Sequence, residues 1–286
     1  MALFENLTFQ AIINQTVWPD FWVIVVDGEL PFKFRLRLEE LTTAYDWIVV
    51  HQWNPTCDWY RLGWVIDLFS IETPFVLTSL IDDDDALDLN YNERLRNQVD
   101  NHIRVGSRFG WFWFGSLCAL EWDLDFSTSE FGFTKPFAGG TDYWQGVGTS
   151  VLVPLASDAP TAYSWSHSVM QDVFGPLWLW RSRNLQKVLR HRLGLVIRLL
   201  RSGRIHWLPS LLWSGWVYDV GTQEHGEFDK LISNSGTNLQ EVRMTLGHDA
   251  RDSQSVMGQL LRFGMSAASM MAIRAAFLDT ESNREE

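Results

Sequence analysis

The sequence predicts an α/β fold with a mostly parallel sheet flanked by helices, followed by a helical C-terminal appendage. Three observations predict it. Apolar runs typical of buried strands alternate with helical spacing from residue 3 to residue 104. Four consecutive aspartates, Asp82 to Asp85, directly follow the apolar run over 74–81. With 286 residues, of which 46% are hydrophobic and 20% charged, the chain can bury a sizeable core.

The first strand expected is Phe21 to Val26, a continuous apolar run with β-branched residues that is typical of a buried parallel strand. A helix over 3–16 precedes it and ends before the turn at Trp18-Pro19-Asp20. The next elements expected are a helix over 31–45, a strand over 47–50, a helix over 58–71, a strand over 74–81 and a helix over 90–104. This alternation predicts βαβ units with right-handed crossovers.

The second half has a different pattern. Residues 109–155 are rich in aromatic residues, Gly and Thr, and strands are expected at 117–122 and 147–155. An amphipathic helix is expected over 177–200, and a last helix over 254–278. We therefore divide the chain into a first domain, 1–172, and a helical, basic and Trp-rich region, 173–286.

The charge is unevenly distributed. The formal net charge is -12, yet the segment 173–218 has no acidic residue and contains eight arginines and lysines. The acidic bulk argues against nucleic-acid binding. With its flanking tryptophans, 177–216 suits peripheral contact with an anionic membrane, and the alternative is a packing helix with a solvated basic face. Two cysteines, no basic leader and no spanning apolar run favour a cytoplasmic protein, peripheral at most on the inner membrane face.

The four aspartates predict a metal and phosphate site. A strand that ends in carboxylates delivers negative charge to the carboxyl edge of a sheet, where open α/β folds bind ligands. Hard oxygen ligands favour Mn²⁺ or Mg²⁺, and such ions pair with phosphates. The alternative is a solvated acidic loop. A calcium loop is excluded, because Leu87 occupies the position that needs glycine.

The N-terminal motifs resemble a family. The blocks that carry the resemblance are Leu3-Phe4-Glu5-Asn6-Leu7-Thr8, Asn14-Gln15-Thr16, Asp20-Phe21, Val25-Val26-Asp27, Leu30-Pro31, Arg35-Leu36-Arg37-Leu38-Glu39, Arg61-Leu62-Gly63 and Leu80-Ile81-Asp82-Asp83-Asp84-Asp85-Ala86-Leu87. They are similar to those of the putative rhamnosyltransferase group, within the family-2-type glycosyltransferases. The resemblance covers residues 3–105 and implies a GT-A-like, Rossmann-like fold. The aspartates correspond to that group's form of the Asp-any-Asp motif.

The resemblance implies an inverting, metal-dependent transfer of a sugar, such as rhamnose, in polysaccharide biosynthesis. The donor is a dTDP- or UDP-sugar, and the acceptor is a glycan or a lipid-linked glycan. Asp82 and Asp83 face the nucleotide-sugar, while Asp84 and Asp85, with His167, hold Mn²⁺ or Mg²⁺. The other implied roles are nucleobase contact by Asp27, nucleotide contact by Arg61, and acceptor base for Asp172 or its rival Asp142.

Each of these roles has an alternative. Asp27 suits a turn or a helix cap equally well, and Arg61 suits an ion pair with Asp58 or Glu39. Relatives have a further strand before the Leu-Phe-Glu segment, whereas Met1 stands almost at the first helix here. Either another segment replaces that strand, or the nucleotide site is altered.

The second candidate function is therefore a non-catalytic binding protein of the same fold. A phosphohydrolase would need histidines beside the aspartates, and the sequence offers only distant ones.

Overall fold

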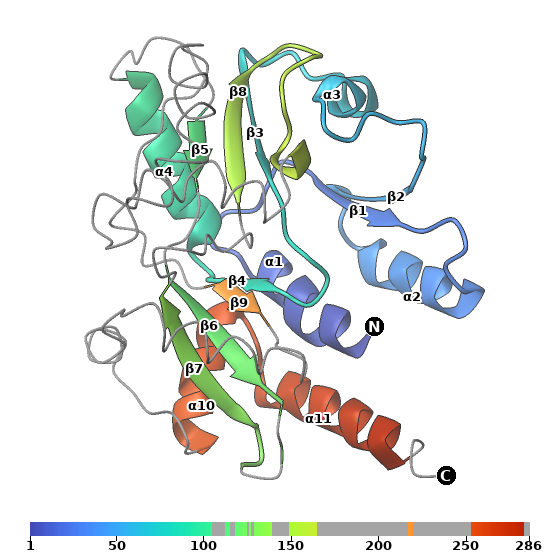
Figure 1. Ribbon diagram of the computed structural model, residues 1–286, viewed down its shortest axis with the longest axis vertical. Coiled ribbons are helices and arrows are strands. Elements are labelled where there is room, and N and C mark those ends of the chain that lie inside the picture. The colour runs from blue at the N-terminus through green and yellow to red at the C-terminus, as the bar shows by residue number, and fades with distance from the viewer. Residues whose placement is uncertain are drawn as a thin grey trace, which may run out of the picture.

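The computed structural model describes most of the first 164 residues and the C-terminal helices (Figure 1). The described residues are 1–104, 112–114, 118–124, 126, 129–138, 149–164, 217–219 and 253–282. They form helices packed around small sheets, so a mixed α/β protein is confirmed, whereas the single, mostly parallel sheet is not found among the described strands. The predicted basic helix at 177–200 lies outside them.

The first sheet is a parallel pair. In chain order its segment contains η1 (Phe4–Thr8), α1 (Phe9–Ile13), β1 (Trp22–Val26), α2 (Phe32–Thr42) and β2 (Ile48–Gln52). Strands β1 and β2 pair in parallel, with Trp22 opposite Ile48 and Val26 opposite Gln52. Leu38 of α2 packs on Ile24 and Ile48 in one apolar cluster. The predicted βαβ unit is confirmed here, because α2 has an apolar stripe that covers the pair.

The second sheet is antiparallel. It follows α3 (Gly63–Phe69) and consists of β3 (Phe75–Ser79), β8 (Ser150–Pro154) and β5 (Phe112–Phe114). β8 lies between β3 and β5 and runs antiparallel to both. The sequence led us to expect β3 in one mostly parallel sheet with β1 and β2. Among the described strands, however, β3 pairs with a strand about seventy residues further on, and only long-range contacts select such a partner.

The third sheet brings together distant segments. It consists of β4 (Ala86–Leu87), β9 (Val217–Asp219), β6 (Cys118–Asp123) and β7 (Phe133–Ala138), in that spatial order. β6 and β7 form an antiparallel pair, and β9 lies between β4 and β6. The strands β4, β5, β7 and β9 had not been predicted, since each is short or lies in a stretch without clear alternation.

Helix α4 (Tyr91–Arg104) follows β4, as predicted for 90–104. Its residues Tyr91, Leu95 and Val99 are buried at helical spacing against Phe114 and Leu152 of the second sheet. Ile103, at the next position of the same spacing, is 46% exposed.

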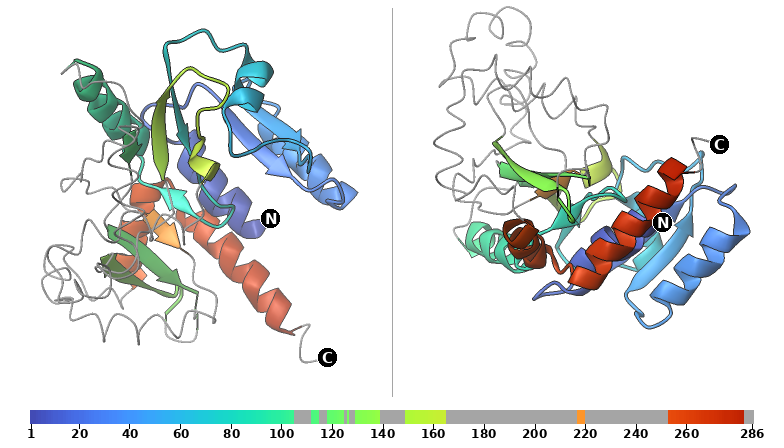
Figure 2. Two further views of the ribbon diagram at one scale, coloured as in Figure 1. Left: turned by 45° about the horizontal axis from the view of Figure 1, so that its top comes forward. Right: turned by 90° about the horizontal axis from the view of Figure 1, so that it is seen from below.

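The C-terminal helices pack on the N-terminal one. They are α10 (Ser253–Leu260), η5 (Leu261–Phe263) and α11 (Ala267–Ser282). Their residues Val256, Phe263 and Ile273 share one buried cluster with Leu7 and Ala11. Figure 2 shows α11 lying beside the N-terminal helix. The two ends of the chain therefore build one core.

The single helix predicted over 254–278 is broken at Gly264. This residue has φ +76°, and a Cβ there would lie 3.0 Å from both the Asn14 Cβ and the Gln10 carbonyl oxygen. Glycine allows both the left-handed conformation and the close approach to α1. No single helix in the described parts of the chain is long and apolar enough to cross a membrane. The pair on either side of this break passes that test jointly, with a bend of 104°.

Candidate functional site

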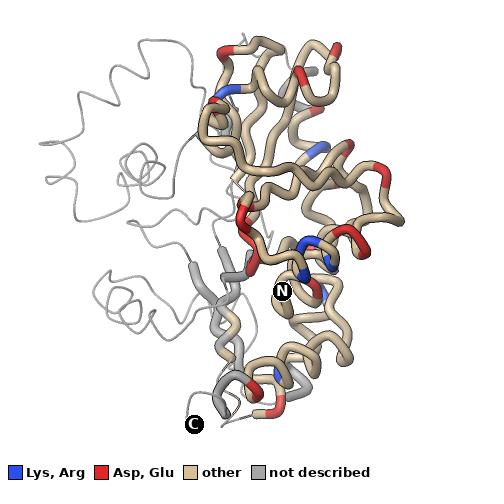
Figure 3. The backbone as a smooth tube through the Cα atoms, turned by 90° about the vertical axis from the view of Figure 1, so that its right-hand side faces the viewer, with Lys and Arg blue, Asp and Glu red and all other residues tan. Residues whose placement is uncertain are grey.

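The four aspartates form a tight turn between β3 and β4. The Asp85 N–H donates to the Asp82 carbonyl at 3.3 Å, and the chain then enters β4. Asp82 and Asp83 are exposed, Asp84 is half-buried, and Asp85 is only 3% exposed. Figure 3 colours the Asp and Glu positions of the described backbone red. The turn thus presents acidic groups to solvent on one side and directs Asp85 into the protein.

Gln15 holds the segment that follows the turn. Its side chain is buried at 5% exposure and donates from Nε2 to the Asp88 carbonyl at 2.8 Å and the Ala11 carbonyl at 2.9 Å. Its Oε1 accepts the Asn92 N–H at 3.1 Å. One amide therefore ties α1 to the exit of the aspartate turn and to the start of α4. A buried amide can satisfy backbone groups in this way without introducing a charge.

A second polar contact comes from the C-terminal helices. The Asp88 carboxylate is almost fully buried, and its Oδ2 lies 3.7 Å from the Arg262 guanidinium. Its Oδ1 accepts the Asn90 N–H at 2.9 Å, and the Leu89 N–H donates to the Arg262 carbonyl at 3.0 Å. The segment just after the aspartates is therefore fixed from two sides, by α1 and by η5.

A chain of three hydroxyls, two of them buried, fixes the strand before the turn. The Ser79 and Ser150 hydroxyls are 2.6 Å apart, and the Tyr91 hydroxyl lies 3.1 Å from that of Ser150. Burial raises the pKa of the Tyr91 phenol well above its usual range, and the hydrogen bond to Ser150 lowers it by a smaller amount. Because Ser79 ends β3, this chain connects the last residue of that strand to β8 and α4.

Asp27 lies in a turn at the end of β1. Its Oδ1 accepts the Glu29 N–H at 2.8 Å, which is an Asx-turn contact, and its side chain is exposed. The next residue, Gly28, lies so close to Gln52 at the end of β2 that a Cβ would be 2.5 Å from its Nε2. The turn role weighed for Asp27 is therefore present.

Arg61 is bound to the segment after β8. Its Nη1 donates to the Asp158 carbonyl at 2.8 Å, and its backbone pairs with Pro160. The ion pair with Asp58 or Glu39, which the sequence offered as an alternative, does not form in the described part of the chain. This bridge also explains why α3 begins at Gly63 and not at 58 as predicted, since residues 60–61 contact the 160–161 segment instead.

Three predicted site residues, Asp142, His167 and Asp172, lie outside the described residues. Within the described part of the chain, no group of three or more His, Cys, Asp and Glu side chains is arranged to hold a metal ion. Asp84 and Asp85 are thus the two members of the predicted ligand set that the structure describes. Their carboxylate oxygens are donors of the type that Mn²⁺ and Mg²⁺ prefer.

Sequence reasoning missed Gln15, Asp88 and Tyr91 as supports of the turn. Gln15 stood in a motif block that the resemblance had brought out, without a role. A polar residue directly after a helical apolar pattern was the available signal. For Asp88 and Tyr91 no such signal existed, because their partners Arg262 and Ser150 are distant in sequence.

The comparison with protein families agrees with the motifs. The profile of the family described as "Putative rhamnosyl transferase" matches residues 1–112, which contain β1, β2, β3 and the aspartate turn. The family resemblance recognised in the sequence is therefore confirmed over this segment. No curated protein and no solved structure matches the chain.

Proposed function

We propose that this protein is a glycosyltransferase that moves a sugar, such as rhamnose, from a dTDP- or UDP-sugar to a glycan or lipid-linked glycan. The observation that supports this most is the fixed aspartate turn at the end of β3, within the segment that matches a rhamnosyl transferase family. The proposal includes a GT-A-like arrangement of β1, β2 and β3 and an inverting transfer.

The proposed roles of the four aspartates follow their burial: the two exposed ones contact the donor, and the two more buried ones hold the metal. Asp82 and Asp83, both exposed, would accept hydrogen bonds from the ribose and the sugar. Asp84 and Asp85, with His167, would hold Mn²⁺ or Mg²⁺, which supplies positive charge to the leaving diphosphate when bound. Asp27 would contact the nucleobase and Arg61 the nucleotide. Asp172 or Asp142 would take the proton from the acceptor hydroxyl.

The contacts below the turn serve this chemistry by pre-organising the carboxylates. Gln15, Asp88 and Tyr91 hold the chain on both sides of the aspartates, so that little ordering is left to occur on binding. The basic segment 177–216 would bring the enzyme to the inner face of the membrane, where a lipid-linked acceptor lies.

Calorimetric titration with dTDP and UDP, with and without Mn²⁺, tests the proposal. We expect binding that requires the metal and is lost in Asp84→Ala. Asp46→Ala is the matched control. Asp46 is an exposed aspartate just before the N-terminal end of β2, and its removal is expected to leave binding intact. Metal-independent binding, or no binding of either nucleotide, would contradict the proposal and favour a non-catalytic binding protein.

A further inference from the structure

Three exposed aromatic side chains gather beside the end of β2. Trp53 is 39% exposed, Tyr60 55% and Tyr163 44%. The Trp53 and Tyr163 ring centroids lie 6.4 Å apart, and those of Tyr60 and Tyr163 lie 5.7 Å apart. We call these three residues the aromatic platform. Exposed apolar side chains are ordinary when scattered, whereas rings in mutual contact on a surface mark a binding site.

The platform rests on a buried ring. Trp53 lies on Trp59 with ring centroids 4.7 Å apart and an angle of 8° between the planes, and Trp59 is only 4% exposed. The Trp59 indole N–H donates to the Asn54 carbonyl at 2.8 Å, and its own carbonyl accepts the Thr161 hydroxyl at 2.8 Å. Because the lower ring is fixed by stacking and hydrogen bonds, the upper ring has a defined face before any ligand arrives.

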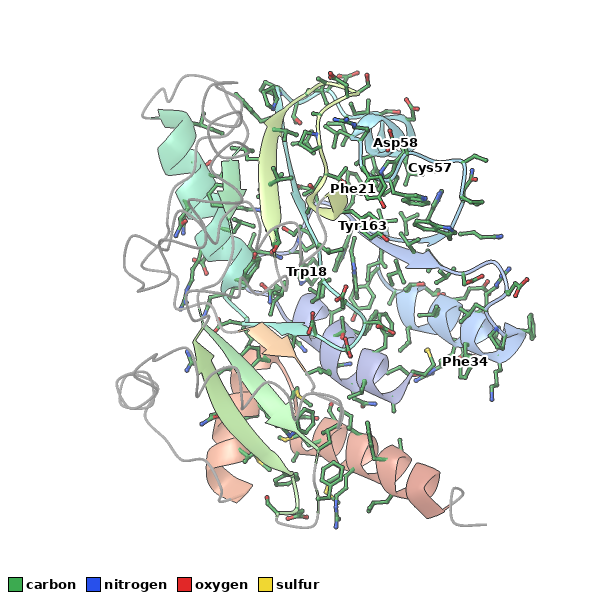
Figure 4. All side chains as sticks on the ribbon, viewed as in Figure 1. Trp18, Phe21, Phe34, Cys57, Asp58 and Tyr163 are labelled. Carbon is green, nitrogen blue, oxygen red and sulfur yellow. The ribbon has the colours of Figure 1, made fainter. Side chains whose placement is uncertain are left out.

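Main-chain contacts place the two tyrosines. The Thr161 N–H donates to the Tyr60 carbonyl at 3.2 Å, next to the bridge between Arg61 and Pro160. The loop after β2 and the segment after β8 are thereby joined. Figure 4 shows Tyr163 on the side of β3 that faces the loop with Cys57 and Asp58.

The platform adjoins the strand that leads to the aspartates. The Ala162 N–H donates to the Thr78 hydroxyl at 2.8 Å. Ala162 directly precedes Tyr163, and Thr78 lies four residues before Asp82. The segment that carries one ring of the platform is therefore hydrogen-bonded to the last part of β3, just before the proposed donor site.

The surroundings favour an uncharged ligand. The exposed residues Asp58 and Asp158 lie close in sequence to the platform, and the guanidinium of Arg61, next to Tyr60, donates to the Asp158 carbonyl. These two carboxylates disfavour a phosphate on the rings themselves, and the contact proposed above between Arg61 and the nucleotide stays compatible, because a guanidinium has five N–H donors. A sugar ring offers C–H faces that pack on aromatic rings, and hydroxyls that hydrogen-bond with exposed polar neighbours such as Asn54 and Thr56.

We propose that the aromatic platform binds an uncharged sugar ring of the acceptor glycan, stacked on Trp53 and bordered by Tyr60 and Tyr163. The proposal rests on the proposed function, because it assigns to the platform the acceptor that the transferase would use. It gives Trp53 and Tyr163 a binding role that is separate from that of the aspartates. The location beside β3 brings the acceptor to the donor site from the side of the loop with Cys57 and Asp58.

Saturation-transfer NMR of the whole chain with the methyl glycosides of rhamnose, glucose and galactose tests this inference. We expect transfer to the ring C–H protons of at least one glycoside. Trp53→Ala is expected to weaken that binding by about fivefold or more, as for other aromatic anchors, whereas Trp53→Phe keeps most of it. Phe32→Ala is the matched control, because Phe32 is a 77% exposed aromatic residue on α2.

Two results would overturn the inference. One is the absence of transfer to all three glycosides, and the other is an equal signal in Trp53→Ala and Phe32→Ala. Calorimetry of the same proteins with dTDP and UDP separates the two proposals. Loss of nucleotide binding in Trp53→Ala with glycoside binding unchanged would show that the ring stacks on a nucleobase, against our assignment. Glycoside binding without any nucleotide binding would support the platform and contradict the transferase.

Discussion

The aspartate turn follows β3 and the aromatic platform is hydrogen-bonded to the same strand, yet different kinds of contact hold the two. The turn is fixed by buried polar groups, namely the Gln15 amide, the Asp88 carboxylate and the Tyr91 hydroxyl. The platform is fixed by ring stacking on Trp59 and by main-chain hydrogen bonds. Each surface has one support of its own chemical kind, a carboxylate beside the carboxylates and a ring beneath the rings. Each also has supports of another kind, an amide and a hydroxyl for the turn and main-chain hydrogen bonds for the platform.

The difference follows from what each surface presents. Carboxylates cannot be held by apolar packing alone, since burial of an unpaired charge costs several kcal/mol, roughly 3–5 when one partner of a buried pair is removed. The turn therefore needs polar supports that satisfy its backbone. Aromatic rings lose nothing when another ring covers one face, so a stacked pair is enough. The two sites should accordingly fail in different ways on substitution.

The largest effect is expected at the base of the platform. Trp59→Ala should lower the free energy of unfolding by about 3–5 kcal/mol, because it leaves a cavity under Trp53. Trp53→Ala removes an exposed ring and should cost roughly 1 kcal/mol or less. Urea unfolding followed by circular dichroism measures both. Equal losses would show that the two rings do not differ as base and surface.

The next effect is expected at the polar support of the turn. Gln15→Ala removes four hydrogen bonds between the buried amide and backbone groups and should lower stability by about 2–3 kcal/mol. The adjacent Asn14→Ala, whose amide is exposed, is the control and should cost about 0.5 kcal/mol. Urea unfolding of the pair checks the prediction. A loss no greater in Gln15→Ala than in Asn14→Ala would mean that the amide does not support the turn.

A smaller effect is expected for Tyr91→Phe, about 1 kcal/mol, because one hydrogen bond to Ser150 is lost. The folded-state pKa of this phenol is raised, so its favourable contribution is fully present below the ordinary tyrosine pKa near 10 and is lost as the pH rises above it. The native protein should therefore lose stability above about pH 10 more steeply than Tyr91→Phe. Identical profiles of stability against pH for the native protein and Tyr91→Phe would contradict this prediction.

The smallest effect concerns Cys57, in the loop that joins β2 to the platform. Burial, and to a smaller extent Asp58, raises the pKa of the half-buried thiol. In a Cys118→Ser background we expect alkylation slower than that of a free thiol at the same pH, since the thiolate is the reactive form. Asp58→Asn should lower the thiol pKa and speed the reaction modestly. An unchanged rate would show that Asp58 does not act on the thiol.

Local pattern was enough to predict the elements around the aspartates. Strands β1, β2 and β3 and helices α2 and α4 were expected within a few residues of where they lie, and so was the placement of Asp82 to Asp85 after a buried strand. Apolar periodicity determines these elements, because the spacing of the apolar side chains places them on the one face of each helix or strand that packs against the protein. The family motifs could also be recognised from the sequence, because each is a short contiguous stretch.

Only the tertiary structure decided which strands and side chains contact each other across distant parts of the chain. The sequence does not show that β3 pairs with β8, that Arg262 contacts Asp88, or that Ala162 is bonded to Thr78. The break at Gly264 likewise arises where the helix meets α1, although the periodicity continues through it. Pairing and close approach between distant segments depend on which surfaces the folded chain brings together, and no local pattern encodes that choice.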